Sequence, residues 1–184
     1  MKATEILMEE HRVIERVLTS LEKAANRLSA GQEIPISFFL KAADFIKGFA
    51  DGCHHKKEEG VLFVKLVANG MSKESGPVAV MLAEHEQGRQ FTRAMREGAE
   101  RLQRGDTTAI PRITQNALGY SALLRQHIQK EDRILFPMAD RIIPVEQQAQ
   151  ITEAFERIEH EETGEGVHDK YLGIANELEK MVTA

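Results

Sequence analysis

The sequence predicts an all-α protein, an up-down-up-down four-helix bundle with an additional C-terminal helix. Three observations support this fold class. Apolar residues recur every three or four positions through five long segments, which is the period of an amphipathic helix. Glycine and proline residues separate these segments. The connections between the first four segments are short, and short connections favour antiparallel packing of successive helices.

The first two helices are defined by apolar stripes that end at strong breakers. The first stripe runs from Leu7 to Leu28, and Gly31 follows it. The second helix covers about residues 37–68 and closes at an Asn-Gly pair that ends with Gly70. We expect both helices to turn one apolar face toward a shared core.

The third and fourth helices follow the same pattern. A Gly-Pro pair at Pro77 is a good helix start, and Gly105 separates the third helix from the fourth. The fourth helix has the most regular stripe, and Pro137 within it should kink the helix or begin its end.

Residues 1–184 read as one domain, with the bundle core at about 4–142 and the extra helix at about 145–182. The stripe of the extra helix weakens around Gly164 and Gly166, where a bend or a break is expected. Nothing in the sequence resembles a long linker or a low-complexity segment.

Composition excludes several classes of function. The chain has 24 Lys and Arg against 29 Asp and Glu and no basic cluster, so we expect neither nucleic acid nor a membrane surface as a partner. No segment approaches the length of a membrane-spanning helix. The N-terminus lacks the apolar run of a signal peptide, and the single Cys53 suits a reducing compartment. We therefore expect a cytoplasmic protein.

One ten-residue motif occurs twice. HHKKEEGVLF at residues 54–63 returns as HIQKEDRILF at residues 127–136. Each copy sets a histidine and a glutamate four residues apart, on one face of a helix. The pairs are His54 with Glu58 and His127 with Glu131. An imidazole beside a carboxylate suits first-row transition metals such as iron and zinc.

A second pair in the first copy, His55 with Glu59, has the same spacing. The two pairs lie about 100° apart on an α-helix, so only one of them should face inward. The repeat favours His54 and Glu58, since His54 and His127 both precede a motif leucine by eight residues. We therefore expect His55 and Glu59 at the boundary of the core.

Two further histidines, His11 and His85, lie on the inner stripes of the first and third helices. Both come early in their helices, whereas His54 and His127 come about two-thirds along theirs. Because alternate helices of the bundle run in opposite directions, all four histidines should meet at one level. His160, flanked by acids, reads as a surface residue.

Four imidazoles and two carboxylates exceed what one tetrahedral zinc ion uses. They suggest two metal ions bridged by the carboxylates, with iron favoured and manganese or zinc as alternatives. The alternative without metal is a buried polar layer in which every histidine is hydrogen-bonded to a glutamate.

With these histidine and glutamate motifs the chain resembles the hemerythrin-like family, also called the HHE cation-binding domain. The resemblance covers about residues 4–142. The family places a histidine on the first helix, His-x-x-x-Glu on the second, and a histidine with a bridging carboxylate on the fourth. The matching residues here are His11, His54, Glu58, His127 and Glu131.

Two departures from the oxygen-carrying members stand out. Those proteins have a second histidine four residues on in the third helix, where His85 is here followed by Arg89. His168 on the extra helix could supply the missing ligand, or the position could be open or filled by water. The carriers also place the last carboxylate at i+5, the position of Asp132, whereas the repeat favours Glu131.

The resemblance implies a centre of two iron ions, oxo- or hydroxo-bridged, that binds O2, NO or a peroxide. The leading expectation is oxygen binding, storage or sensing, and the alternative is an enzyme acting on peroxide or NO, or iron donation in iron-sulfur cluster repair. Tyr120 and Tyr171 could supply electrons, although core tyrosines usually only pack. Because histidines must be neutral to bind metal, we expect iron to be lost below a pH of about 6.

Overall fold

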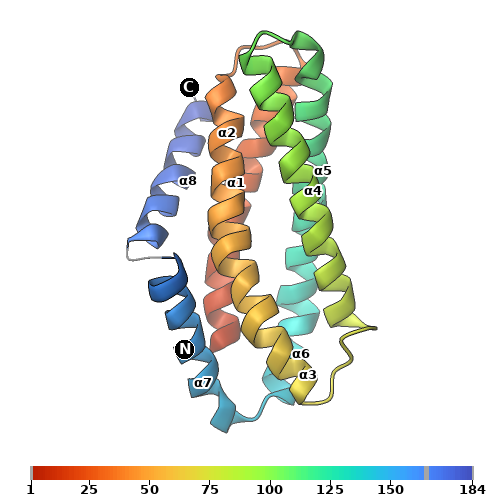
Figure 1. Ribbon diagram of the computed structural model, residues 1–184, viewed down its shortest axis with the longest axis vertical. Coiled ribbons are helices and arrows are strands. Elements are labelled where there is room, and N and C mark those ends of the chain that lie inside the picture. The colour runs from red at the N-terminus through yellow and green to blue at the C-terminus, as the bar shows by residue number, and fades with distance from the viewer. Residues whose placement is uncertain (1, 164–165, 184) are drawn as a thin grey trace.

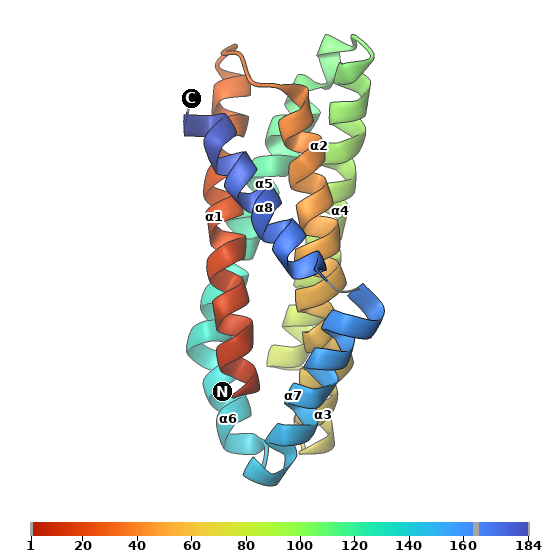
Figure 2. The same cartoon turned by 90° about the vertical axis from the view of Figure 1, so that its left-hand side faces the viewer.

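Long helical stretches stand side by side along the longest axis of the molecule (Figures 1 and 2). The computed structural model describes residues 2–163 and 166–183, and the regular structure in these ranges is helical. The stretches are α1 (Ala3–Ser29); α2 (Ile36–Phe45), η1 (Ile46–His55), η2 (Glu58–Leu62) and α3 (Phe63–Ala68); α4 (Pro77–Gln103); and α5 (Ile110–Lys130), η4 (Glu131–Leu135) and α6 (Phe136–Ile142). The segments η1, η2 and η4 have π-helical hydrogen bonding.

Connections alternate between the two ends of the molecule (Figure 1). Residues 30–35 join α1 to α2 at the upper end, residues 69–76 join α3 to α4 at the lower end, and residues 104–109, including the 3-10 turn η3 (Thr107–Ala109), return at the upper end. Among the packed pairs, α4 lies against α5, α1 against α5, and α2 against α4.

The fourth stretch continues past its proline. Pro137 is the second residue of α6, and helical structure runs on to Ile142. The π-helical η4 ends two residues before Pro137. Because proline has no N–H to donate, a wider turn just before it changes the hydrogen-bond register where a donor is missing. At Pro137, where the sequence predicts a kink or the beginning of the helix end, the structure has a local π-helical segment within a helix that continues to Ile142.

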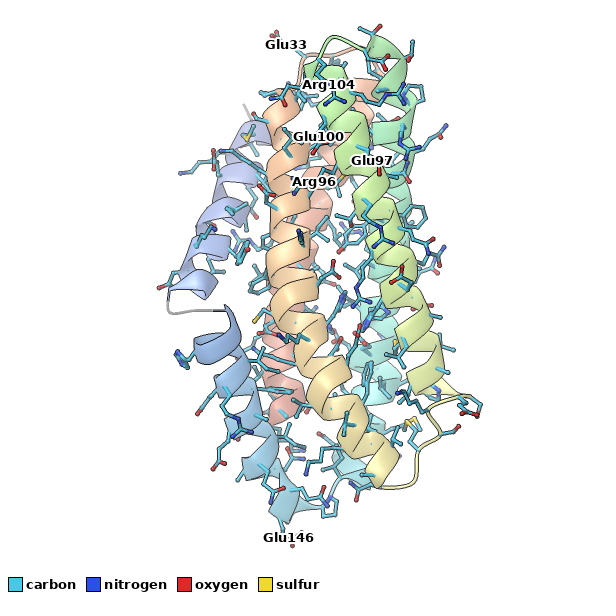
Figure 3. All side chains as sticks on the ribbon, viewed as in Figure 1. Glu33, Arg96, Glu97, Glu100, Arg104 and Glu146 are labelled. Atoms are coloured by element: carbon cyan, nitrogen blue, oxygen red, sulfur yellow. The ribbon has the colours of Figure 1, made fainter. Side chains whose placement is uncertain are left out.

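The C-terminal part is two helices where the sequence predicted one with a bend or break. After the 3-10 turn η5 (Val145–Gln147) come α7 (Gln148–Arg157) with η6 (Ile158–Thr163), and then α8 (Val167–Thr183). Glu146 marks the lower tip, at the turn into α7, and Glu33 marks the opposite end (Figure 3). From there α7 packs on α1 and η2, whereas α8 packs on the other half of α1 and on α2 (Figure 2).

Two separate apolar clusters fill the interior. The larger one includes Leu18, Phe45 and Leu124, and the smaller one includes Leu7 and Phe155. The buried charged residues lie mainly in the turns of helix between these clusters. Burial of apolar surface on both sides fixes the height of each helix and therefore the level at which its polar side chains meet. In the described residues no helix is both long and apolar enough to cross a membrane.

Candidate metal centre

Seven buried histidine and glutamate side chains from the four helical stretches form a polar layer, which we call the central cluster. It consists of two groups that share Glu58, and within each group the ligand atoms lie within 4.8 Å of one another. One group is His11, His54, Glu58 and Glu131, and the other is His55, Glu58, His85 and His127. All six residues predicted from the first four helices are therefore brought together, and His55 joins them.

The two glutamates span the two groups. Glu131 Oε1 lies 3.2 Å from His127 Nε2, and its Oε2 lies 3.2 Å from His11 Nε2. Glu58 Oε1 lies 3.5 Å from His54 Nε2, and its Oε2 lies 3.4 Å from His85 Nε2. Each carboxylate thus turns one oxygen toward each group, as a carboxylate bridging two cations would.

The expectation that His55 lies at the core boundary is wrong. His55 is 2% exposed, and its ring stacks on that of His85 at a centroid distance of 3.8 Å. The reason is that η1, which ends at His55, is π-helical and not α-helical. Its i→i+5 hydrogen bonds put more residues into each turn, so neighbouring side chains diverge by a smaller angle. Both histidines can therefore face inward, while Glu59 stays at the boundary with 30% of its side chain exposed.

Each cluster histidine donates through Nδ1 to a carboxylate outside the cluster. We call these acceptors the outer carboxylates. The pairs are His11 with Asp132 at 2.7 Å, His54 with Glu10 at 2.8 Å, His55 with Asp51 at 2.9 Å, His85 with Glu59 at 2.8 Å, and His127 with Glu84 at 2.9 Å. A carboxylate on Nδ1 fixes the proton there and leaves Nε2 to bind a metal, an arrangement typical of histidine ligands in metalloproteins.

The inward atoms of the cluster fit a metal better than they fit one another. Six buried atoms have no hydrogen-bond partner among the described residues: His11 Nε2, His54 Nε2 and all four carboxylate oxygens of Glu58 and Glu131. His85 Nε2 and His127 Nε2 lie 3.0 Å apart. Buried polar atoms without partners cost about 1–3 kcal/mol each. The predicted alternative, a layer satisfied by hydrogen bonds alone, does not describe this cluster, whereas cations between these atoms would satisfy them.

Basic side chains surround the outer carboxylates in turn. Lys57 Nζ donates to Glu10 at 2.5 Å, and Arg89 Nη2 donates to Glu59 at 2.5 Å. Burial lowers the pKa of Lys57, but Glu10 more than offsets this, so the net pKa is raised and the lysine stays charged. The remaining pairs are Arg12 with Asp132, Lys130 with Glu84, and Arg89 Nε with Asp51 at 3.8 Å.

The outer residues were missed at the level of sequence, although the repeat contains their signal. The acid that follows Glu58 or Glu131 in the motif accepts a hydrogen bond from a histidine of another helix. Glu59 accepts from His85 of the third helix, and Asp132 accepts from His11 of the first. The last residue of each motif, Phe63 or Phe136, stacks on that same histidine ring. Glu10 and Glu84 each directly precede an inner histidine, and each accepts from a motif histidine. The two halves of the chain therefore supply equivalent parts, and His55 with Asp51 breaks that symmetry.

The charges of the cluster shift its titration. Burial lowers the pKa of His11, but the hydrogen bond to Asp132 and the adjacent Glu131 outweigh it and raise the pKa to about 9. Burial likewise lowers the pKa of His127, and Glu131 and Glu84 raise it to about 10. For His55, burial and the nearby histidines hold the pKa well below its ordinary value. In the metal-free protein the cluster therefore holds protons that a metal must displace.

Three predictions made from the family resemblance concern positions around the cluster. Arg89, at the expected place of a further histidine, binds an outer carboxylate instead. Asp132 also lies in the outer layer, and Glu131 occupies the inner position favoured by the repeat. The prediction for His168 concerns a side chain outside those that the structure describes, and His160 is exposed as expected.

The two tyrosines differ in their surroundings. Tyr120 is 1% exposed and its Oη has no hydrogen bond among the described residues. Burial raises its pKa well above the ordinary value, so it remains a neutral phenol. Tyr171 is half-buried and packs on the rings of Phe45 and Phe49. Neither phenol contributes a ligand atom to the central cluster.

A helical protein with a buried histidine and glutamate cluster belongs to the class of cation-binding helical proteins. Residues 2–139 match the model of the family described as the hemerythrin HHE cation-binding domain. The chain belongs to this family.

Curated relatives match nearly the whole chain. Uncharacterized proteins of Mycobacterium bovis and of two strains of Mycobacterium tuberculosis are each 26% identical over 180 residues, which is 98% of this chain and 70% of the relative. The similarity therefore extends past the residues matched by the family model, into the C-terminal helices. No solved structure matches at a significant level.

Replacing His55 tests whether this unexpected member of the cluster holds a metal. We expect His55→Ala to lower metal uptake by its own group, because that group would lose one of three imidazoles, while the group with His11 and His54 keeps all its ligand atoms. Equilibrium dialysis with Zn²⁺ or, without oxygen, Fe²⁺ would measure this. His160→Ala is the matched control, because His160 is exposed. Equal metal uptake by the two variants would exclude His55 as a ligand.

Proposed function

We propose that this chain is a non-haem diiron protein that binds O2 or a related small molecule. The metal pair would lie at the centre of an up-down-up-down four-helix bundle, with the whole chain acting as one domain. His11 and His54 would hold one ion, and His55, His85 and His127 the other. Glu58 and Glu131 would bridge them.

The observation that carries this proposal is the pairing of each histidine with an outer carboxylate through Nδ1, which leaves five Nε2 atoms and two carboxylates directed at one small volume. Mixed nitrogen and carboxylate ligation suits iron. The similarity of residues 2–139 to a cation-binding family supports the same interpretation.

The two groups are unequal, which favours binding of an external ligand. One group offers three imidazoles and the other offers two. Glu58 belongs to both groups, and Glu131, which belongs to the group with two imidazoles, also lies 3.2 Å from His127 of the other group. The group of His11 and His54 therefore leaves more room for a further ligand. Reduced iron with an open position supplies affinity for diatomic molecules and peroxide. The protein contributes a dry site, since every cluster residue is at most 2% exposed, and burial at this level favours a small ligand over a large one.

Anaerobic loading with Fe(II) tests the metal part of this proposal. We expect about two iron ions per chain, since each of the two ligand groups would hold one ion. Iron would be measured by elemental analysis after removal of the excess. A plateau at one ion per chain or below would rule out the diiron assignment.

Absorption spectra after addition of O2, NO or H2O2 to the loaded protein test the ligand part. A stable spectrum that reverses when O2 is removed is the expected result for binding, storage or sensing. Repeated consumption of peroxide or NO would instead favour the enzymatic alternative. In that case the first group to replace is the buried Tyr120 Oη, by Tyr120→Phe, since it has no hydrogen bond within the part of the chain that the structure describes.

A further inference from the structure

The motif lysines Lys57 and Lys130 occupy equivalent positions, three residues after His54 and His127. Each binds the carboxylate that accepts the Nδ1 proton of its own motif histidine. The first chain of contacts is His54, Glu10 and Lys57, and the second is His127, Glu84 and Lys130. The repeat therefore builds the same three-residue unit twice, once on each side of the cluster.

The two units differ in burial. The Lys57 side chain is 0% exposed and that of Glu10 is 4% exposed, whereas Lys130 and Glu84 are 36% and 18% exposed. Lysine is almost never fully buried unless it is paired. A charge in the interior acts on its neighbours more strongly than the same charge at the surface, because the surrounding dielectric is lower. Lys57 should therefore influence the cluster more than Lys130 does.

A third residue makes the first unit distinct. Lys57 Nζ also binds Glu159 of η6, and it lies 5.7 Å from the centre of the Phe155 ring of α7. Phe155 is 1% exposed and packs in the smaller apolar cluster, which holds α7 against the bundle. Both residues lie beyond the family match, which ends at residue 139. The C-terminal segment thus places a negative charge on a buried lysine two contacts away from His54.

The charges along this chain alternate in sign. A positive Lys57 draws electron density from Glu10 and weakens the hydrogen bond that Glu10 accepts from His54 Nδ1. The imidazole of His54 is then less basic, and its Nε2 is a weaker metal ligand. Glu159 offsets part of that positive charge. Given the diiron function proposed above, we propose that Lys57 is a positioning residue, opposed by Glu159 of the C-terminal segment, that sets the reduction potential on the side of the cluster that holds His54.

Substitutions at the two residues should have opposite effects. Glu159→Gln leaves the lysine charge uncompensated, which favours ferrous iron and raises the midpoint potential. Lys57→Met removes the positive charge, which favours ferric iron and lowers it. We expect each to change the ratio of ferric to ferrous iron at a fixed solution potential by about tenfold, or about 59 mV for one electron. Lys130→Met is the matched control, and we expect a change of less than about threefold because its charge is screened by solvent.

The measurement is a spectroelectrochemical titration of the loaded full-length chain, with the iron content determined for each variant. A second readout uses Zn²⁺-loaded protein, in which the Nδ1 proton resonance of His54 reports its hydrogen bond to Glu10. We expect Glu159→Gln to shift that resonance upfield and Lys57→Met to shift it downfield.

Shifts of the same sign for the two variants, or none, would overturn the inference, because a purely structural role gives no opposition of sign. Lys57→Met leaves two carboxylates without their buried partner, and if it fails to fold, Glu159→Gln decides, since the Glu159 side chain is 32% exposed. Two irons per wild-type chain with unchanged potentials in Glu159→Gln would refute this inference and leave the diiron function standing. Fewer than two irons in the wild type would refute both.

Discussion

Glu131→Ala is expected to leave a folded protein that holds neither ion of the proposed diiron centre. Glu131 is 0% exposed, and its two oxygens lie 3.2 Å from His127 Nε2 and 3.2 Å from His11 Nε2, one in each group. In the proposed centre, removing this one side chain would remove a ligand atom from both ions and a negative charge that would offset theirs. We expect affinity for both to fall by more than the roughly 10–100-fold typical of losing an outer partner of a ligand.

The adjacent Asp132 provides the control. It contacts His11 only from the outer side, through Nδ1, and 17% of its side chain is exposed. Asp132→Ala should therefore lower the affinity for the ion beside His11 by about 10–100-fold and leave the second ion bound. Metal content by elemental analysis, together with far-UV circular dichroism, would compare the two variants. If Asp132→Ala lost both ions and Glu131→Ala kept them, the bridging carboxylate would be at i+5, the spacing of the oxygen carriers.

The circular dichroism of both variants should stay close to that of the wild type. The apolar clusters on the two sides of the polar layer are separate from it, and they include residues of all four helical stretches. Helix formation depends mainly on this apolar burial. Metal loss with retained helix would therefore separate the effect on the site from an effect on the fold.

The helices and the common level of six cluster residues followed from the sequence because both depend on simple periodicity. Apolar spacing fixes which face of a helix is buried, and alternating helix direction fixes which residues share a level. The repeat also separated Glu58 from Glu59, and the structure buries the first and leaves the second partly exposed. These inferences needed only the regular α-helical period and the order of the segments.

The rest depended on departures from that period and on contacts between distant segments. The predicted position of His55 is wrong because it assumes the α-helical angle between neighbouring residues, whereas η1 is π-helical. The contact between Glu159 and Lys57 spans 102 positions along the chain, so no local pattern reveals it. The acid that follows Glu58 or Glu131 is visible in the repeat, but its histidine partner lies on another helix, so the contact depends on how the helices pack.

Metal binding is expected to release protons and to become steeply weaker as pH falls. In the metal-free protein, hydrogen bonds and neighbouring carboxylates raise the pKa of His11 to about 9 and that of His127 to about 10. Both are protonated near neutral pH and must lose a proton to bind metal. Each ligand group contains one of these two histidines, so the metal affinity of each group should fall by about tenfold per pH unit below about pH 9, and the affinity for loading both groups by about a hundredfold. Competition by protons begins well above the pH of about 6 expected from an unperturbed histidine.

The stability of the metal-free protein should change with pH in the opposite direction. A group whose pKa is raised on folding stabilises the folded state below its unfolded pKa, here about 6.5, and this contribution is lost as pH rises through the folded pKa. The free energy of unfolding of the metal-free protein should therefore fall between about pH 7 and 10, by about 1.4 kcal/mol per bound proton per pH unit, and the melting temperature should fall with it.

Calorimetry of Zn²⁺ binding at pH 7.5 in buffers of different ionisation enthalpy would count the released protons. Glu131→Gln should flatten the pH dependence of melting, because Glu131 contributes to both raised pKa values. Release of less than one proton on binding, or an equally steep melting profile in the variant, would contradict this account of the buried charges.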